Sequence, residues 1–224
     1  MPRIARAVAE GYPHHIIQRG NNRADVFSDS EDRKQYLSLL KKYSDKWQTP
    51  VLAYCLMSNH VHLLVKPAIE KSLFKMMQGL TLCYTQFYNR KYGMTGRLWE
   101  NRYHSCIVDQ ERYLWAVARY IEQNPVRARI VRKAERYPYS SARAHVTGAE
   151  DVVLGETLFE EEQRDDYIRM LRTETVEEEK EVLRYHSRSG RPFGEKEFVQ
   201  GIEQKLKRPL ARRPRGRPKK NNAL

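Results

Sequence analysis

The feature that most constrains the fold is a pair of β-forming runs on either side of a two-residue polar turn. Residues 51–57 form the first run and residues 60–65 the second, with a Ser-Asn pair between them. Runs of this composition around a short turn predict a β-hairpin. Because side chains alternate along a strand, His60 and His62 point to one face and Val61 to the other. The hairpin therefore belongs to a larger sheet with one buried face and one face that is partly polar.

The remaining elements follow from changes in hydrophobic period. Residues 14–19 and 102–108 have the short pattern of strands. Three longer segments, 28–47, 69–92 and 110–124, place apolar residues at helical spacing and predict helices. Ser28 or Ser30 can cap the first helix. Asp109 can cap the third helix, and Pro125 stops it. The order β-α-β-β-α-β-α predicts an α+β protein of ferredoxin-like kind, an antiparallel sheet with helices packed mainly on one face. Shorter helices are predicted within 176–185 and 187–206.

The composition fits one ordinary domain with appendages, or two small domains. Of the 224 residues, 40% are hydrophobic, which suffices for a core, and 31% are charged. This balance argues against wholesale disorder, and no run approaches the roughly 18 consecutive apolar residues that a membrane-spanning helix needs. The first twelve residues lack the apolar segment of a signal peptide. We therefore expect a cytoplasmic, nucleoid-associated protein that binds no membrane.

The charge is unevenly distributed along the chain, whose net charge is +13. Residues 1–149 hold 24 basic and 12 acidic groups, residues 150–181 hold 4 and 13, and residues 201–224 hold 9 and 1. These shifts predict a folded domain at 1–148, an acidic segment with short helices at 149–204, and a basic, disordered extension at 205–224. Around Arg215 and Arg217 the extension resembles the AT-hook, an arm that contacts the minor groove of A·T-rich DNA. A solubilising tail is the alternative.

His60 and His62 are the first candidates for chemistry. Two imidazoles on one strand face, about 6.5 Å apart along the chain, can share a divalent metal ion. On the third long helix, Tyr120 and Asn124 lie one turn apart and can reach the same small volume. A phenol oxygen can attack phosphorus, and an amide oxygen can bind a hard cation. The alternatives are two surface histidines, a tyrosine at the core edge and an asparagine at a helix end, and the residues alone favour these.

Four segments in the same order carry a family resemblance. Residues 57–65, Met-Ser-Asn-His-Val-His-Leu-Leu-Val, and 119–128, Arg-Tyr-Ile-Glu-Gln-Asn-Pro-Val-Arg-Ala, resemble the single-tyrosine His-hydrophobic-His transposases. Residues 18–23, Gln-Arg-Gly-Asn-Asn-Arg, and 98–103, Leu-Trp-Glu-Asn-Arg-Tyr, are similar to the REP-associated tyrosine transposases, the domesticated bacterial branch of that superfamily. The resemblance spans about residues 10–142 and is much looser after residue 150.

The resemblance implies the HUH nuclease fold and a metal-dependent endonuclease and strand-transferase of single-stranded DNA. His60 and His62 would bind Mg²⁺ or Mn²⁺, and Tyr120 would attack the scissile phosphate, leaving a 5′-phosphotyrosine and a free 3′-OH. Asn124 falls where the family often has a Gln as third metal ligand, and it is one methylene shorter. The implied substrate is a repetitive extragenic palindrome, a DNA hairpin beside a short single-stranded guide. The arginines expected to contact DNA are Arg19, Arg97, Arg102, Arg119, Arg127, Arg215 and Arg217.

Two further functions stay open from the sequence. A protein of the same fold can bind hairpin DNA or RNA without turnover, and a regulator can act mainly through its C-terminal region while the body only dimerises. The oligomeric state is open as well, because related transposases include dimers that exchange the tyrosine helix. We expect a monomer or a homodimer.

Overall fold

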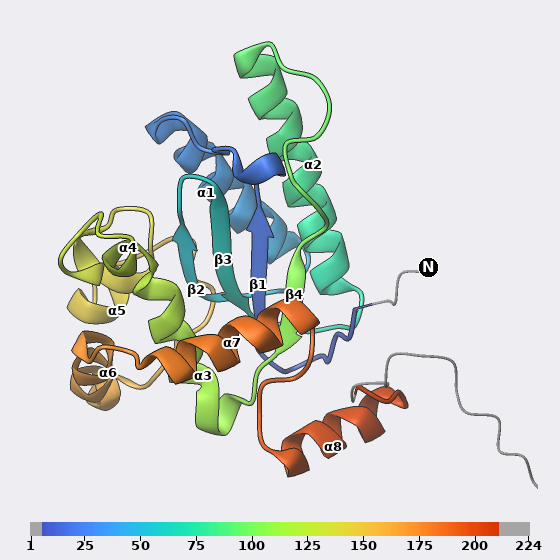
Figure 1. The fold of residues 1–224 in the computed structure, drawn as a ribbon, viewed down its shortest axis with the longest axis vertical. Helices are drawn as coiled ribbons and strands as arrows, with labels where there is room; N and C mark the ends of the chain where they lie inside the picture. Colours follow the sequence, from blue (N-terminus) through green and yellow to red (C-terminus); the bar gives the residue numbers. More distant parts are fainter. Residues whose placement is uncertain (1–5, 211–224) are drawn as a thin grey trace, which may run out of the picture.

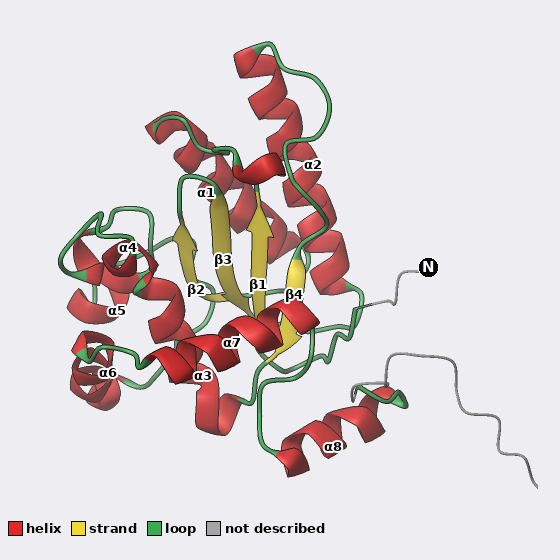
Figure 2. Ribbon diagram, in the orientation of Figure 1, coloured by secondary structure: helices red, strands yellow, loops and turns green. Residues whose placement is uncertain are grey.

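The computed structural model describes residues 6–210, which contain a four-stranded antiparallel sheet (Figures 1 and 2). The strands are β1 (His14–Arg19), β2 (Val51–Leu56), β3 (His60–Val65) and β4 (His104–Ile107), in the order β2-β3-β1-β4. The predicted hairpin is β2-β3, and β1 lies antiparallel to β3 with Ile17 opposite His62. The α+β class with an antiparallel sheet is therefore confirmed.

Helices cover both faces of this sheet, whereas the sequence placed them mainly on one face. Helices α1 (Ser30–Lys46) and α2 (Ser72–Tyr92) pack together behind the sheet in the view of Figure 1, and α3 (Gln110–Glu122) and α7 (Glu177–Ser189) lie over the front. The reason lies in β2, where alternate residues are buried on both sides. Tyr54 and Leu56 belong to the core under α1 and α2, while Ala53 and Cys55 belong to the core under α3.

The chain beyond residue 148 packs against the same sheet. Its helices are α6 (Arg164–Arg172), α7 and α8 (Lys196–Leu206), which follow α4 (Asn124–Arg127) and α5 (Ala142–Thr147). Tyr167, Leu171 and Leu183 are buried in the core under α3. The acidic segment predicted at 149–204 is thus physically continuous with the body, because its few apolar residues fill this second core. Among residues 6–210, no helix combines the length and the hydropathy that crossing a membrane requires.

Local signals account for the helix ends that position the site. Asp29 caps α1 in a reciprocal capping box with Asp32, in place of the expected Ser28 or Ser30. Asp109 caps α3 as predicted, its side chain accepting a hydrogen bond from the backbone N–H of Glu111. Pro125, which was predicted to stop the helix, is itself helical. It sits in the first turn of the short helix α4, where a missing N–H costs nothing.

Segments of the same chain cover part of both outer edges of the sheet. Along β2, the N–H of Leu56 donates to the carbonyl of Tyr139, and the N–H of Gly155 donates to the carbonyl of Val51. Along β4, the N–H of Phe193 donates to the carbonyl of Ile107 at 2.7 Å. Unpaired edge strands are ready to pair with another chain, so these contacts restrict sheet extension between copies.

Candidate active site

The face of the sheet under α3 and α7 carries the histidines. Strand alternation puts His60 and His62 on this face, with ring centroids 5.1 Å apart, and Val61 in the opposite core, as predicted. The Tyr120 ring projects from α3 to 5.8 Å from the ring of His62. The neighbouring strand adds His15, whose ring stacks on His62 at 5.3 Å and lies 5.9 Å from Tyr120. Three imidazoles and one phenol of a single chain therefore meet at one point.

The hydrogen bonds around His60 fix which of its ring nitrogens carries the proton. The side-chain amide of Asn59 donates through Nδ2 to the carbonyl of Arg23 at 3.0 Å, which turns its Oδ1 toward the ring. This Oδ1 lies 2.6 Å from Nδ1 of His60. An amide oxygen can only accept, so Nδ1 of His60 is the protonated nitrogen. The lone pair of its Nε2 is left for a metal ion.

A longer chain of hydrogen bonds fixes His62 in the same way. The hydroxyl of Ser187 in α7 donates to the carbonyl of Leu183 at 2.8 Å, so its oxygen accepts from Nδ1 of His15 at 2.9 Å. Nε2 of His15 then accepts from Nδ1 of His62 at 3.0 Å. The lone pair of Nε2 in His62 is again left for a metal ion. Such outer partners commonly orient metal-binding histidines in proteins.

Burial keeps these imidazoles neutral. It lowers the pKa of His60 to about 4, and the charges of Arg19 and Arg127 act in the same direction. Burial also lowers the pKa of His62 well below its usual value, with His60 and His15 nearby as further causes. The pKa of His15 falls to about 3, mainly through burial and then through the charge of Arg127. A metal ion binds the neutral form of imidazole, so His60 and His62 remain competent ligands near neutral pH.

The donor set fits a catalytic metal ion with open positions. Two neutral imidazoles offer lone pairs on one face, next to a phenol. Within the described part of the chain, no group of three or more His, Cys, Asp or Glu side chains is arranged to hold a metal. An ion bound here would therefore complete its shell with water or substrate oxygens, which is the arrangement of catalytic rather than structural sites.

Two arginines flank the Tyr120 side chain. The guanidinium of Arg127 lies over the Tyr120 ring, 4.3 Å from its centroid, and donates to the Tyr120 carbonyl at 2.8 Å. Arg184 of α7 lies near the Tyr120 side chain and forms an ion pair with Glu177 at 2.6 Å. Two cationic side chains therefore lie beside the Tyr120 phenol.

Asn124 lies one turn beyond Tyr120, as predicted, but its amide faces its own helix. Its Nδ2 donates to the carbonyls of Tyr120 at 3.1 Å and Ile121 at 2.9 Å. These bonds satisfy carbonyls that lack partners at the end of α3. Only Oδ1 is left for a metal ion, so its role as third ligand stays a prediction.

Comparison with known families places these residues in context. The family described as transposase IS200-like matches residues 9–124, which is more than half of the chain and includes His60, His62 and Tyr120. The chain belongs to the IS200-like transposases. Helix α7 lies beyond the matched range, so the contacts of Arg184 and Ser187 are additions to the family region. No curated protein matches the chain.

A solved structure shares the fold of this IS200-like transposase. A REP-associated tyrosine transposase bound to a REP hairpin matches with a TM-score of 0.51 at 15% identity, over 71% of this chain and 94% of that one. A protein from Deinococcus radiodurans, described as a proposed transposase, matches with a TM-score of 0.39 at 19% identity, over 55% of this chain and 97% of that one. At such low identity, the first match establishes a common fold around the site.

In this IS200-like transposase, the arginines that the sequence analysis expected to contact DNA lie in different parts of the structure. Arg19 and Arg127 act on the histidines, as the pKa shifts show. Arg119 is buried and pairs with Glu179 of α7 at 2.5 Å. Arg97 and Arg102 line a different groove, of about 450 Å³, between α2 and residues 96–103. Arg215 and Arg217 lie outside the described residues.

Three residues of the site escaped the sequence analysis of this transposase: His15, Arg184 and Ser187. For His15 a signal existed, because strand alternation puts it on the same side of β1 as Ile17, whose partner in the sheet is His62. The arginine and the serine lie in a segment of unremarkable composition, and only the packing of α7 brings them to the site.

Proposed function

We propose that this IS200-like transposase is a metal-dependent endonuclease and strand-transferase of single-stranded DNA, with Tyr120 as nucleophile. The observation that carries the proposal is the meeting of Tyr120 with His60 and His62 at one point of one chain, 5.8 Å from ring to ring for Tyr120 and His62. Both imidazoles present a lone pair beside a phenol that can be deprotonated. This combination suits attack on a phosphodiester.

The proposed reaction exchanges one phosphodiester for another. The oxygen of Tyr120 attacks the scissile phosphorus and loses its proton to solvent, and the bond to the 3′-oxygen breaks. The products are a 5′-phosphotyrosine and a strand with a free 3′-OH. Attack by a 3′-OH on the phosphotyrosine reverses the step and joins strands without ATP. Mg²⁺ or Mn²⁺ held by Nε2 of His60 and His62 would supply Lewis-acid polarisation of the phosphate and support for the leaving oxygen.

The residues around Tyr120 supply the remaining electrostatics. The guanidinium groups of Arg127 and Arg184 stabilise the phenol oxygen as its proton leaves. Arg19 adds positive charge on the side of His60, where a phosphate would approach. Asn124 stands within one turn of Tyr120 as the proposed third ligand through its Oδ1.

The proposed substrate is a hairpin-forming repetitive extragenic palindrome with a single-stranded flank. Support comes from the sequence segments shared with the REP-associated branch and from the related fold that has been solved with a REP hairpin. A net charge of +13 suits a polyanionic partner.

One chain suffices for the proposed reaction. The histidines and the tyrosine come from the same chain, and residues 139–155 and Phe193 cover part of both sheet edges. A dimer that exchanges the tyrosine helix is not required to assemble the site. We therefore propose a monomer as the active form.

The test compares wild type with Tyr120→Phe on hairpin oligonucleotides drawn from the host's extragenic palindromes, with Mn²⁺, Mg²⁺ or EDTA. Wild type should form a covalent adduct, visible on a denaturing gel, only when metal is present. The phosphate stays on the 5′ side of the downstream fragment, so a 3′-label should travel with the protein and a 5′-label should be released. Tyr120→Phe should form no adduct and bind as before.

Tyr113→Phe is the matched control, because Tyr113 lies on the same helix and packs its ring against Phe193 at 4.5 Å. It should form the adduct as wild type does. Cleavage by Tyr120→Phe would exclude the assigned nucleophile. Tight binding without an adduct, across several repeats, would instead favour a protein that binds hairpins without turnover.

A further inference from the structure

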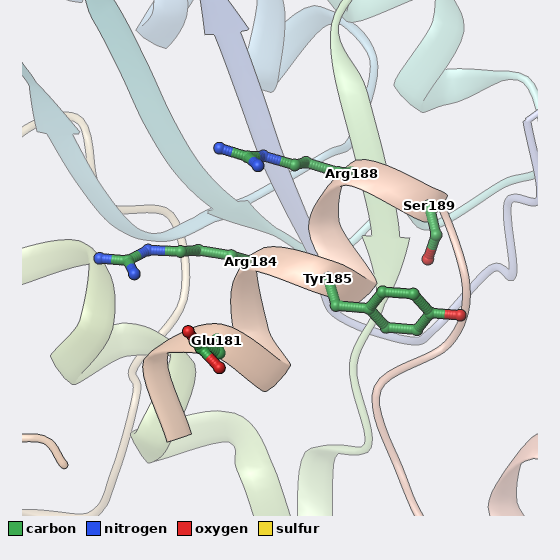
Figure 3. A pocket seen from close by; sticks show the side chains of 5 residues that line it. All are labelled: Glu181, Arg184, Tyr185, Arg188 and Ser189. Atoms are coloured by element: carbon green, nitrogen blue, oxygen red, sulfur yellow. The ribbon is translucent and has the colours of Figure 1, made fainter. Parts of the chain in front are cut away.

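A pocket of about 620 Å³ opens along the exposed side of α7, next to the candidate active site. Glu181, Arg184, Tyr185, Arg188 and Ser189 line it (Figure 3). Its inner wall is firmly anchored, because Leu183 and Ser187 on the opposite side of α7 are each only 1% exposed. The helix that carries the pocket is therefore anchored in the fold, and its position lies outside the family region at residues 9–124.

The side chains of the two arginines of this pocket, Arg184 and Arg188, point the same way. They are separated by four residues, about 6 Å of helix rise, and so lie on one side of α7. Figure 3 shows both guanidinium groups extending the same way from the helix, across the strands. The charged end of Arg184 lies near the Tyr120 side chain. Arg188 lies beyond it, and its backbone accepts a hydrogen bond from the side chain of His104 in β4.

The other charges around the pocket leave room for an anion. Glu177 pairs with Arg184, and its side chain is 58% exposed, so an incoming phosphate can replace it. Glu181 is exposed at the pocket wall and opposes an anion. Arg188 is exposed and forms no ion pair among residues 6–210. Tyr185, 48% exposed, adds an aromatic ring of the kind on which unstacked bases rest.

We propose that the α7 pocket binds the backbone of the single DNA strand beside the scissile phosphate, with Arg184 and Arg188 holding neighbouring phosphates. The proposal rests on the proposed function, since it assigns the strand that Tyr120 cleaves to this pocket. Guanidinium groups suit this role because they form charge-assisted hydrogen bonds to phosphate oxygens. The helix that orients His62 from its buried side thus holds the substrate on its exposed side.

The experiment measures binding of fluorescein-labelled (dT)20 by anisotropy in EDTA, so that no cleavage occurs, over a series of salt concentrations. For single strands, each phosphate contact contributes about 0.7 to the slope of log affinity against log salt. Arg188→Gln should lower that slope by about 0.7 and weaken binding roughly tenfold at low salt. Arg184→Gln should do the same. Glu181→Gln should tighten binding, because it removes the opposing charge.

Arg112→Gln is the matched control. Arg112 is an exposed arginine that pairs with Glu195 at 2.5 Å, away from the residues that line the pocket. Its substitution removes the same charge and should leave the slope within error of the wild-type value. If Arg188→Gln and Arg112→Gln lower the slope equally, the effect is one of net charge, and the pocket has no specific role.

A parallel adduct assay with Mn²⁺ separates this proposal from the proposed function. An adduct in wild type together with unchanged slopes for Arg184→Gln and Arg188→Gln would overturn the pocket and keep the nuclease. Lowered slopes without any wild-type adduct would keep the pocket and overturn the nuclease. Faster adduct formation by Arg184→Gln with unchanged binding would show that Arg184 restrains Tyr120, which also overturns the pocket.

Discussion

The two faces of the sheet show how one strand serves both stability and chemistry. On β3, Val61, Leu63 and Val65 are fully buried in the core under α1 and α2. On the other face of this strand, His60 and His62 point toward α3 and α7 and form the candidate site. Because side chains alternate, a strand can present an apolar face and a reactive face one residue apart. The difference teaches that one face of a strand can supply stability while the other face, one residue away, carries the chemistry.

The helices that cover the two faces also differ in their contacts. Helices α1 and α2 meet the sheet mainly through apolar and aromatic side chains. Over the other face, α3 is held by a buried carboxylate, because Glu122 accepts hydrogen bonds from Ser141, His145 and Tyr167 at 2.5 to 2.8 Å. Directional bonds of this kind fix the rotation of a helix more strictly than apolar contact does. The orientation of Tyr120, two residues earlier, follows from them.

The largest expected effect comes from the apolar face. Leu63→Ala should lower the free energy of unfolding by about 3 kcal/mol, because it leaves a cavity in a tightly packed core. Urea denaturation monitored by circular dichroism measures this change. The affinity of the folded variant for Mn²⁺, measured by titration calorimetry, should equal that of wild type. A matching loss of metal affinity would show that the two faces cannot be separated.

His14, on the apolar side of β1, tests how burial alone changes the pKa of a histidine. Nδ1 of His14 bonds to the carbonyl of Tyr12 at 2.7 Å, and Nε2 accepts from the N–H of Ala9 at 3.2 Å. Burial lowers the pKa of His14 to about 4, whereas in the unfolded chain it is near 6.5. The unfolded chain therefore binds the proton first as the pH falls from 6.5 toward 4, and stability should drop by about 3 kcal/mol in that window.

Comparison with His14→Gln isolates this contribution from that of the other histidines. The free energy of unfolding of both proteins is measured in urea at pH 7.0 and at pH 4.5. Wild type should lose more stability than the variant, since only wild type keeps an imidazole that resists protonation at this position. Equal losses in the two proteins would mean that His14 is not held neutral by burial.

The smallest effect should come from Ser187, which reaches His62 only through His15. Ser187→Ala removes the acceptor of the His15 N–H and should weaken Mn²⁺ binding roughly tenfold, with little change in stability. Ser187→Thr keeps the hydroxyl and should restore the affinity. Thr147→Ala is the control, because its hydroxyl also bonds to a carbonyl four residues back, that of Arg143, but touches no histidine. If Ser187→Ala binds Mn²⁺ as tightly as wild type, the contact between Ser187 and His15 has no role in orienting His62.

Much of the fold and part of the site could be predicted from local sequence. The hairpin, the faces of His60 and His62, the Asp109 cap and the helix that carries Tyr120 all follow from periodicity and from turn and cap residues. These signals act over a few residues, where backbone geometry alone decides which way a side chain points. The matched family region, residues 9–124, likewise contains Tyr120, His60 and His62.

The sequence by itself determined the four strands, the three long helices and the chemical types gathered in residues 57–65 and 119–128. Tertiary structure decided that helices cover both faces, that His15 stacks on His62, and that α7 brings Ser187 and Arg184 to the site. His15 and Ser187 are 172 residues apart in the chain, so no local pattern relates them. Their meeting depends on how Leu183 and its neighbours fill the second core, and that is set by the packing of the whole molecule.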